Sequence, residues 1–178
     1  MSDAEDSGEK TRAILKSRAK ALSQVKADAV AEGEALDVVG FMLGSECYGV
    51  ETRYVRDVFP LAELVRLPGI PPFVLGIVNV RGRILSVVDL GILFDLPSRG
   101  IGEYDRVIAL RDGEMEFGLL GTAILGLRRI LRGSLQPFLP TLTGIREKYL
   151  IGVSPERMAV LDAARILSDP NMVVHDKA

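Results

Sequence analysis

The chain has 178 residues, of which 48% are hydrophobic and 26% are charged, a composition that is typical of a globular protein and excludes a disordered chain. Its 22 lysine and arginine residues stand against 24 acidic residues, and a net charge of −2 provides no global positive field for nucleic acid. A single histidine, His175, and a single cysteine, Cys47, exclude a Ser-His-Asp or Cys-His catalytic group in the folded body, an internal disulfide and a multi-cysteine metal site. These counts favour binding over catalysis, with no cofactor and no metal.

The amino-terminal part of the chain differs in character from the rest. It begins with acidic residues and lacks the basic-then-apolar order of a signal peptide, while the longest uncharged stretch, 67–80, is too short to span a bilayer. We therefore expect a cytoplasmic protein without a membrane-inserted segment. Residues 11–27 contain neither glycine nor proline and carry apolar residues at helical spacing, which predicts a basic helix within an extension formed by residues 1–36.

From residue 38 onward, short apolar runs alternate with turn residues, a pattern that predicts β-hairpins. The strongest turn signal is Asp112-Gly113, and Arg81-Gly82 stands between two apolar runs in the same way. Brief helices are expected at Leu90–Phe94 and Ala163–Leu167. The predicted hairpins are Val38–Leu43 with Glu46–Val50, Leu75–Asn79 with Ile84–Val88, Arg106–Leu110 with Met115–Leu120, and Tyr149–Val153 with Met158–Leu161.

The hairpins recur in an order that indicates a duplicated unit of roughly sixty residues. Gly49 and Gly118 occupy equivalent places in the two copies, and so do Asp89 and Asp162, which we expect to cap the short helices that follow them. Because a small open sheet leaves two unpaired edges, closure into barrels is favoured. The sequence therefore predicts a mainly β fold of two small barrels with a shared interior, in lobes at about 38–98 and 104–162.

The segment Asn79-Val80-Arg81-Gly82 has two interpretations. In the first, Gly82 supplies a positive φ for a hairpin turn and Arg81 only points into water. In the second, a rigid turn presents the Arg81 guanidinium for bidentate pairing with a carboxylate of a partner. The turn alone favours the first interpretation.

Two neighbouring segments are also candidates for contact with a partner. Val55-Arg56-Asp57-Val58 alternates apolar and charged residues, so a strand there places Val55 and Asp57 on one face and the other two residues on the opposite face. This strand is either a docking edge or an ordinary half-buried strand. The proline-containing loop 67–73 is stiff enough to lose little entropy in a complex, but packing across a barrel end is the favoured interpretation.

Taken together, these segments resemble the CheW family of bacterial chemotaxis coupling proteins. The resemblance covers about residues 37–168, with 169–178 as a tail, and implies two SH3-like five-stranded β-barrel subdomains that share a hydrophobic core. The order and spacing of four runs carry it: Cys47–Val50, Val55–Val58, Leu67–Gly82 and Val87–Leu90.

The resemblance implies a non-enzymatic adaptor. Such proteins bind the regulatory domain of the histidine kinase CheA and the cytoplasmic tip of methyl-accepting chemotaxis receptors. Carried over by motif, Asn79, Arg81 and Gly82 are expected at the receptor-facing surface, and Val55 and Asp57 match the family's receptor-docking strand. Through these partners, the protein is expected to be associated with membrane receptor arrays.

Two other functions are consistent with parts of the sequence. Gly121-Thr122 stands where family members usually carry a Val-Asp pair, and residues 126–132 are unusually basic, which motivates an adaptor of a divergent pathway such as motility or development. A small-barrel enzyme or ligand-binding protein that uses Asp89 and Asp162 is a third hypothesis, and it requires the two carboxylates to lie close together in one pocket.

Overall fold

The computed structural model describes residues 16–17, 35–97, 100–102, 105–137 and 144–172. Two compact units are distinguished: one comprises Leu36–Ile130 and Ser134–Ala178, and the other comprises Met1–Ala35 and Leu131–Gly133. Lys16 and Ser17 are helical, whereas the rest of the predicted helix 11–27 lies outside the described residues, as does the end of the chain from residue 173. Within the described ranges, no helix is both long and apolar enough to cross a membrane.

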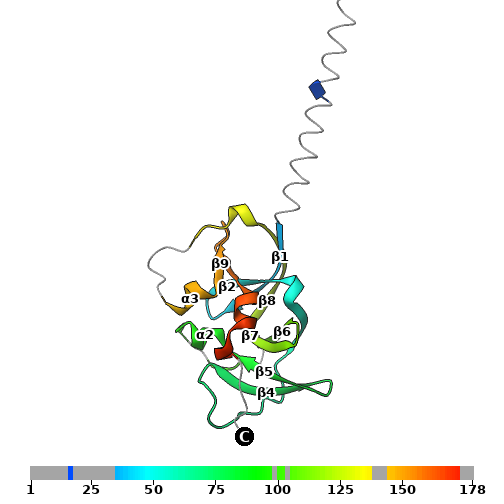
Figure 1. Cartoon of the computed structure of the whole chain (residues 1–178), viewed down its shortest axis with the longest axis vertical. Helices are drawn as coiled ribbons and strands as arrows, with labels where there is room; N and C mark the ends of the chain where they lie inside the picture. Colours follow the sequence, from blue (N-terminus) through cyan, green and yellow to red (C-terminus); the bar gives the residue numbers. More distant parts are fainter. Residues whose placement is uncertain (1–15, 18–34, 98–99, 103–104, 138–143, 173–178) are drawn as a thin grey trace, which may run out of the picture. The chain divides into compact units, whose positions relative to one another are not determined.

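The described strands form two five-stranded sheets, which confirms the predicted mainly β fold (Figure 1). All four predicted hairpins are present, and so are the two brief helices. Sheet A has the order β8 (Ala123–Leu131), β1 (Ala35–Leu43), β2 (Glu46–Glu51), β10 (Ala159–Leu161) and β9 (Leu150–Val153). Sheet B has the order β3 (Val55–Pro60), β6 (Arg106–Asp112), β7 (Met115–Gly121), β5 (Arg83–Val88) and β4 (Val74–Val80). The helices are η1 (Thr52–Tyr54), α2 (Leu90–Leu93), η2 (Arg132–Ser134), α3 (Ile145–Lys148), α4 (Ala163–Ser168) and η3 (Pro170–Met172).

The two sheets have the same topology. The strands β1 to β5 of the first repeat correspond to β6 to β10 of the second. When each strand is replaced by its counterpart, the order of sheet B becomes the order of sheet A. The first two strands of each repeat belong to one sheet and the last three belong to the other. The chain therefore contains a duplicated unit, and its two copies are intertwined.

This intertwining differs from the predicted lobes at 38–98 and 104–162, because neither sheet is built from one half of the chain. The hairpin β1–β2 offers an unpaired edge, and β10 of the second repeat pairs with it in parallel, with Val160 opposite Gly49. In sheet B the pairing is the same, with Val87 of β5 opposite Gly118 of β7. The free edge of each hairpin is thus paired with a strand of the other repeat. In a separate lobe, that edge would instead be paired with a strand of the same repeat.

The interior is divided into one shared cluster and two smaller ones. The central cluster contains residues of both sheets, such as Phe41 and Tyr48 of sheet A and Ile108 and Leu110 of sheet B, all buried. Leu85, Val87, Val107 and Ala109 belong to a second cluster, within sheet B, and Val38, Met158 and Val160 belong to a third, within sheet A. Ile70 and Phe73 of the loop 67–73 pack against the central cluster, which supports its interpretation as a cross-connection.

The equivalent glycines of the two repeats provide a test of this packing. At Gly118, an added Cβ would lie 2.3 Å from Val107 Cγ1, whereas at Gly49 it would lie 2.8 Å from Met158 Sδ. Valine is restricted to few rotamers, but a methionine side chain adapts to its surroundings. We expect Gly118→Ala to lower the free energy of unfolding by about 2–3 kcal/mol and Gly49→Ala by less than about 1.5 kcal/mol. Urea unfolding measures both, and equal losses would contradict the packing described for β6 and β7.

Candidate functional site

The hairpin β4–β5 ends in a two-residue turn. Val80 pairs with Arg83, which leaves Arg81 and Gly82 between the strands. Both have positive φ, 52° for Arg81 and 82° for Gly82, as in the type I′ turns that suit the twist of a hairpin. The side chain of Asn79 stiffens the turn, because its Oδ1 accepts the Gly82 N–H at 2.9 Å. The positive φ of Gly82 is confirmed, but that of Arg81 could not be predicted because non-glycine residues adopt it uncommonly.

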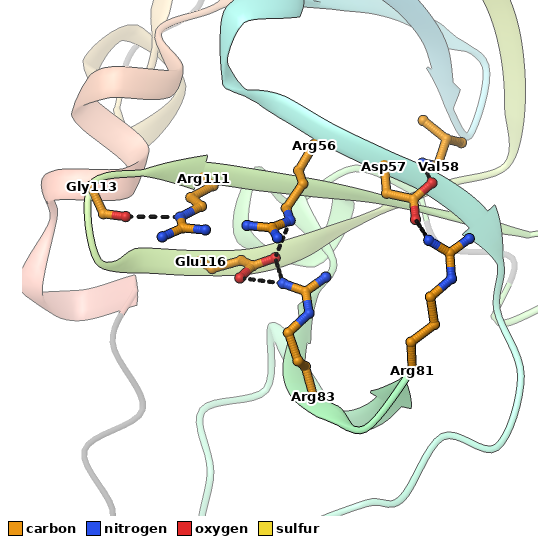
Figure 2. Close-up of polar contacts among 8 residues, drawn as sticks. All are labelled: Arg56, Asp57, Val58, Arg81, Arg83, Arg111, Gly113 and Glu116. Carbon is orange, nitrogen blue, oxygen red and sulfur yellow. Dashed lines mark hydrogen bonds and ion pairs between the residues drawn. The ribbon is translucent and has the colours of Figure 1, made fainter.

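The side chain of Arg81 is exposed and lies near one carboxylate. It is 83% exposed, and its Nη1 lies 3.5 Å from Asp57 Oδ2 (Figure 2). Asp57 is positioned by its other oxygen, Oδ1, which accepts the N–H of Val58 at 2.8 Å. An exposed ion pair of this length contributes at most about 1 kcal/mol to stability. Because a guanidinium has five N–H donors, Arg81 keeps most of its hydrogen-bonding capacity for a partner.

Strand β3 differs from the predicted alternation because it contains a bulge. Val55 pairs with Leu110 and Asp57 with Ala109, so Arg56 is an additional residue between them. Leu110 belongs to the central cluster and Ala109 to the cluster within sheet B. Paired residues share a face of a sheet, and Val55 and Asp57 therefore lie on opposite faces of β3, where strict alternation had placed them on one face.

The structure thus gathers four of the five sequence-predicted site residues. Asn79, Arg81 and Gly82 form the turn, and Asp57 reaches it from β3. Val55 is half-buried and packs against the central cluster instead. Its side chain is not part of the charged group at the turn.

A second carboxylate beside the turn, that of Glu116 on β7, is not among the site residues that the sequence predicts. Arg83 donates through Nη1 to both Glu116 oxygens, at 2.6 and 2.8 Å, and Arg56 Nε lies 3.8 Å from Glu116 Oε1 (Figure 2). The group joins β3, β5 and β7 beside the turn. Its members are far apart in the sequence, and no local motif marks them. Only the register between the strands brings them together.

The two repeat-equivalent aspartates are used as helix caps, as predicted. Asp89 Oδ1 accepts the Gly91 N–H at 2.8 Å at the start of α2, and Asp162 Oδ1 accepts the Arg165 N–H at 3.1 Å at the start of α4. Burial raises the pKa of Asp89, although the hydrogen bond from Gly91 opposes this effect. Each carboxylate serves its own helix, which gives no support to the hypothesis of one catalytic pocket.

Other features that could support chemistry are weak in the described part of the chain. Burial raises the pKa of the Cys47 thiol, which disfavours the reactive thiolate. No group of three or more histidine, cysteine, aspartate or glutamate side chains within the described ranges could hold a metal ion. The geometry therefore defines a mainly β domain in which two intertwined sheets support an arginine at the tip of a stiff hairpin.

Comparison with known proteins gives this domain its family. A family model described as "CheW-like domain" matches residues 37–171. The chemotaxis protein CheW of Klebsiella aerogenes is 27% identical over 139 residues, which cover 76% of this chain and 84% of that protein. Protein FrzA of Myxococcus xanthus is 32% identical over 114 residues, covering 64% of this chain and 70% of that protein. A solved structure, the scaffolding protein TtCheW of Thermoanaerobacter tengcongensis, matches with a TM-score of 0.63 at 27% identity, over 71% of this chain and 88% of that chain. The chain belongs to the CheW-like family.

Proposed function

We propose that the protein is a non-enzymatic adaptor that couples chemoreceptors to a CheA-type histidine kinase in bacterial chemotaxis. Relatives named as chemotaxis protein CheW and a structural neighbour described as a scaffolding protein support this function. Its partners are the regulatory domain of the kinase and the cytoplasmic tips of methyl-accepting receptors. The protein acts in the cytoplasm and joins membrane receptor arrays through these partners.

The observation that carries the proposal is the presentation of Arg81. The turn holds this arginine in the left-handed backbone region, with φ 52°, where a residue other than glycine is disfavoured. The side chain remains 83% exposed, and among the described residues its ion-pair contact is the 3.5 Å contact with Asp57. A strained position with little benefit to stability is typical of a residue kept for binding. Asp57, Asn79, Arg81 and Gly82 form the receptor-facing site, with Val55 on the same docking strand.

Charge reversal at this turn tests the proposal. We expect Arg81→Glu to weaken binding of a receptor-tip fragment by about tenfold or more, because it replaces a charge-assisted hydrogen bond by repulsion. The melting temperature should change little, since the contact with Asp57 is 3.5 Å long and the Arg81 side chain is 83% exposed. Isothermal titration with the tip fragment, and separately with the kinase regulatory domain, measures the effect.

The matched control is Arg157→Glu. Arg157 is also exposed and also has a positive φ, 63°, but it lies in the turn before β10 of sheet A. The substitution therefore makes the same change of charge at a residue with the same left-handed backbone conformation. An equal loss in both variants would contradict the role of Arg81. Absence of binding to either fragment by the folded wild-type protein at micromolar concentrations would refute the adaptor function itself.

A second candidate function is that of an adaptor in a divergent pathway such as motility or development. Two observations favour it: the relative FrzA, at 32% identity, is not named as a chemotaxis protein, and exposed Arg128 and Arg129 give β8 a basic surface. Co-purification of a partner other than a standard chemotaxis kinase, together with the identity of the chromosomal neighbours, separates the two functions.

The proposed architecture goes beyond the sheet order. Each five-stranded sheet closes as an SH3-like barrel within a CheW-like domain that begins at about residue 37 and is preceded by a basic helix at 11–27. Residues 169–172 belong to the folded domain and not to the expected tail, because Asp169 and Met172 are buried and η3 spans Pro170–Met172. The small clusters within sheets A and B support this closure, because each provides an interior for one barrel in addition to the central cluster. The strand order, with a parallel pair in each sheet, is also compatible with it.

A further inference from the structure

A hollow of about 560 Å³ lies beside the start of β3 and is lined largely by arginine. Arg53 and Tyr54 come from η1, Arg56 from β3, and Arg111 from the end of β6. Among the described residues, the lining contains one carboxylate, that of Asp112, against these three guanidinium groups. In a chain with a net charge of −2, this local excess of positive charge is distinctive.

The three arginines differ in how much of their hydrogen-bonding capacity is already used. Arg53 is engaged by Glu51, through contacts of 2.8 Å from Nε and 3.1 Å from Nη2, and its guanidinium lies 4.8 Å from the centre of the Tyr54 ring. Arg111 donates its Nε–H to the carbonyl of Gly113 at 2.9 Å and has no carboxylate within ion-pair distance among the described residues. Its two terminal amino groups therefore remain available.

Arg56 is also incompletely paired. Its nearest carboxylate in the described part of the chain is Glu116, with 3.8 Å between Arg56 Nε and Oε1, which is too long for a hydrogen bond. Both Glu116 oxygens instead accept hydrogen bonds from Arg83 Nη1. Figure 2 shows the guanidinium groups of Arg56 and Arg111 over the same hairpin, β6–β7. An acidic group that enters the hollow meets two guanidinium groups, and no carboxylate of the described residues is hydrogen-bonded to either of them.

The hollow and the candidate site at the turn both involve strand β3. Arg56 lines it and is adjacent in β3 to Asp57, the residue that contacts Arg81. The Glu116 contacts also link Arg56 to Arg83, which follows the turn. Arg56 of the hollow is thus one residue away from the carboxylate that contacts Arg81, and a partner segment at Arg81 has the hollow on the same strand.

We infer that this arginine-lined hollow binds a carboxylate-bearing segment of the protein partner that contacts Arg81, with an Asp or Glu side chain held between Arg56 and Arg111. Guanidinium groups bind carboxylates with bidentate hydrogen bonds, and clusters of arginine are a common means of recognising acidic motifs. The inference rests on the proposed function for the identity of the partner. The partner is therefore expected to carry an Asp or Glu residue near the residue that contacts Arg81.

The chemistry of the hollow is tested with a synthetic peptide of glutamate and serine, and a control peptide of glutamine and serine. We expect the glutamate peptide to shift the NMR signals of backbone amides in 53–56 and 111–113, and the glutamine peptide to leave them unchanged. Arg111→Glu should remove these shifts, whereas Arg128→Glu, an equal charge change on exposed β8, should preserve them. Equal shifts with both peptides, or full displacement by inorganic phosphate at the same concentration as the peptide, would overturn the inference.

Titration of the receptor-tip fragment separates this inference from the proposed function. We expect Arg56→Glu and Arg111→Glu each to weaken binding by about fivefold and to reduce its dependence on salt. If Arg81→Glu weakens binding but neither of these variants does, the hollow is not a partner site and the adaptor function stands. If the tip does not bind but the glutamate peptide shifts the amides of the hollow, the acidic-segment site stands and the proposed function fails.

Discussion

Replacing Gly76 by alanine is expected to lower the free energy of unfolding by about 3–5 kcal/mol, the largest loss we expect from a single methyl group in this protein. Gly76 lies in β4 with φ 147°, in the region that L side chains rarely adopt. An added Cβ would lie 2.2 Å from the carbonyl oxygen of Val65 and 2.9 Å from its carbon. These atoms belong to the backbone, so no rotation of a side chain relieves the overlap.

The substitution should also release the segment that precedes β4. Val65 is joined to β4 by two hydrogen bonds, from its N–H to the Ile77 carbonyl at 2.8 Å and from the Ile77 N–H to its own carbonyl at 2.9 Å. Both must break if the backbones separate to accommodate the Cβ. We therefore expect amide hydrogen exchange at Ile77 to accelerate, in addition to the global loss measured by urea unfolding.

Gly69→Ala is the matched control for the backbone conformation. Gly69 also has a positive φ, 74°, but an added Cβ there meets no atom within 4 Å. Its substitution should cost only the conformational penalty of about 1 kcal/mol. If Gly69→Ala and Gly76→Ala are equally destabilising, the close approach of Val65 to β4 is not what requires glycine at position 76.

Replacing Asp169 by asparagine is expected to lower the free energy of unfolding by about 2–4 kcal/mol near neutral pH. The Asp169 side chain is 3% exposed and lies between α4 and η3. It accepts hydrogen bonds from Lys148 Nζ, the Tyr149 hydroxyl and the backbone N–H of Asn171. Asparagine has one acceptor oxygen and an amide that donates, so at least one of these donors loses its partner.

The pH dependence of this effect has a defined direction. The ion-paired hydrogen bond from Lys148, followed by those from Tyr149 and Asn171, holds the pKa of Asp169 well below its ordinary value. A carboxyl group whose pKa is lower in the folded state stabilises the protein above its unfolded pKa of about 4, and this contribution is lost as the pH falls through the folded value. The difference in stability between wild type and Asp169→Asn should therefore be constant above about pH 5 and shrink below about pH 4.

Urea unfolding at a series of pH values measures this difference. Asp37→Asn is the control, because Asp37 pairs with Arg129 at 3.2 Å and both side chains are more than half exposed. It should cost less than about 0.5 kcal/mol. A difference between wild type and Asp169→Asn that does not change down to pH 2 would show that the carboxylate charge contributes nothing at this position.

The features that the sequence predicts correctly are local ones. Turn pairs such as Asp112-Gly113, and apolar runs of strand length on either side, define a hairpin without reference to the rest of the chain. The caps at Asp89 and Asp162 are equally local, since each aspartate precedes a short apolar helix. The turn at Arg81 belongs to the same class, because its position depends only on the two strands beside it.

The features that it does not predict depend on pairing between distant strands. Separate lobes and intertwined repeats have the same hairpins and the same apolar pattern. The two folds differ in whether β10 and β5 pair with a hairpin of their own repeat or, as observed, with that of the other repeat. The bulge at Arg56 shifts the register of β3 against β6 by one residue, and no residue pattern in the sequence marks it. Glu116 meets Arg83 for the same reason, across 33 positions of sequence separation.

The exchange of strands between the repeats also determines when each sheet is completed during synthesis. Sheet B has all its strands once residue 121 has left the ribosome, but sheet A waits for β10, which ends at Leu161. The hairpin β1–β2 is made first and yet keeps an open edge until nearly the whole domain has been translated. Sheet B is thus available as a template before sheet A can close. A chain that ends before Leu161 leaves the edge of the hairpin β1–β2 unpaired and prone to aggregation.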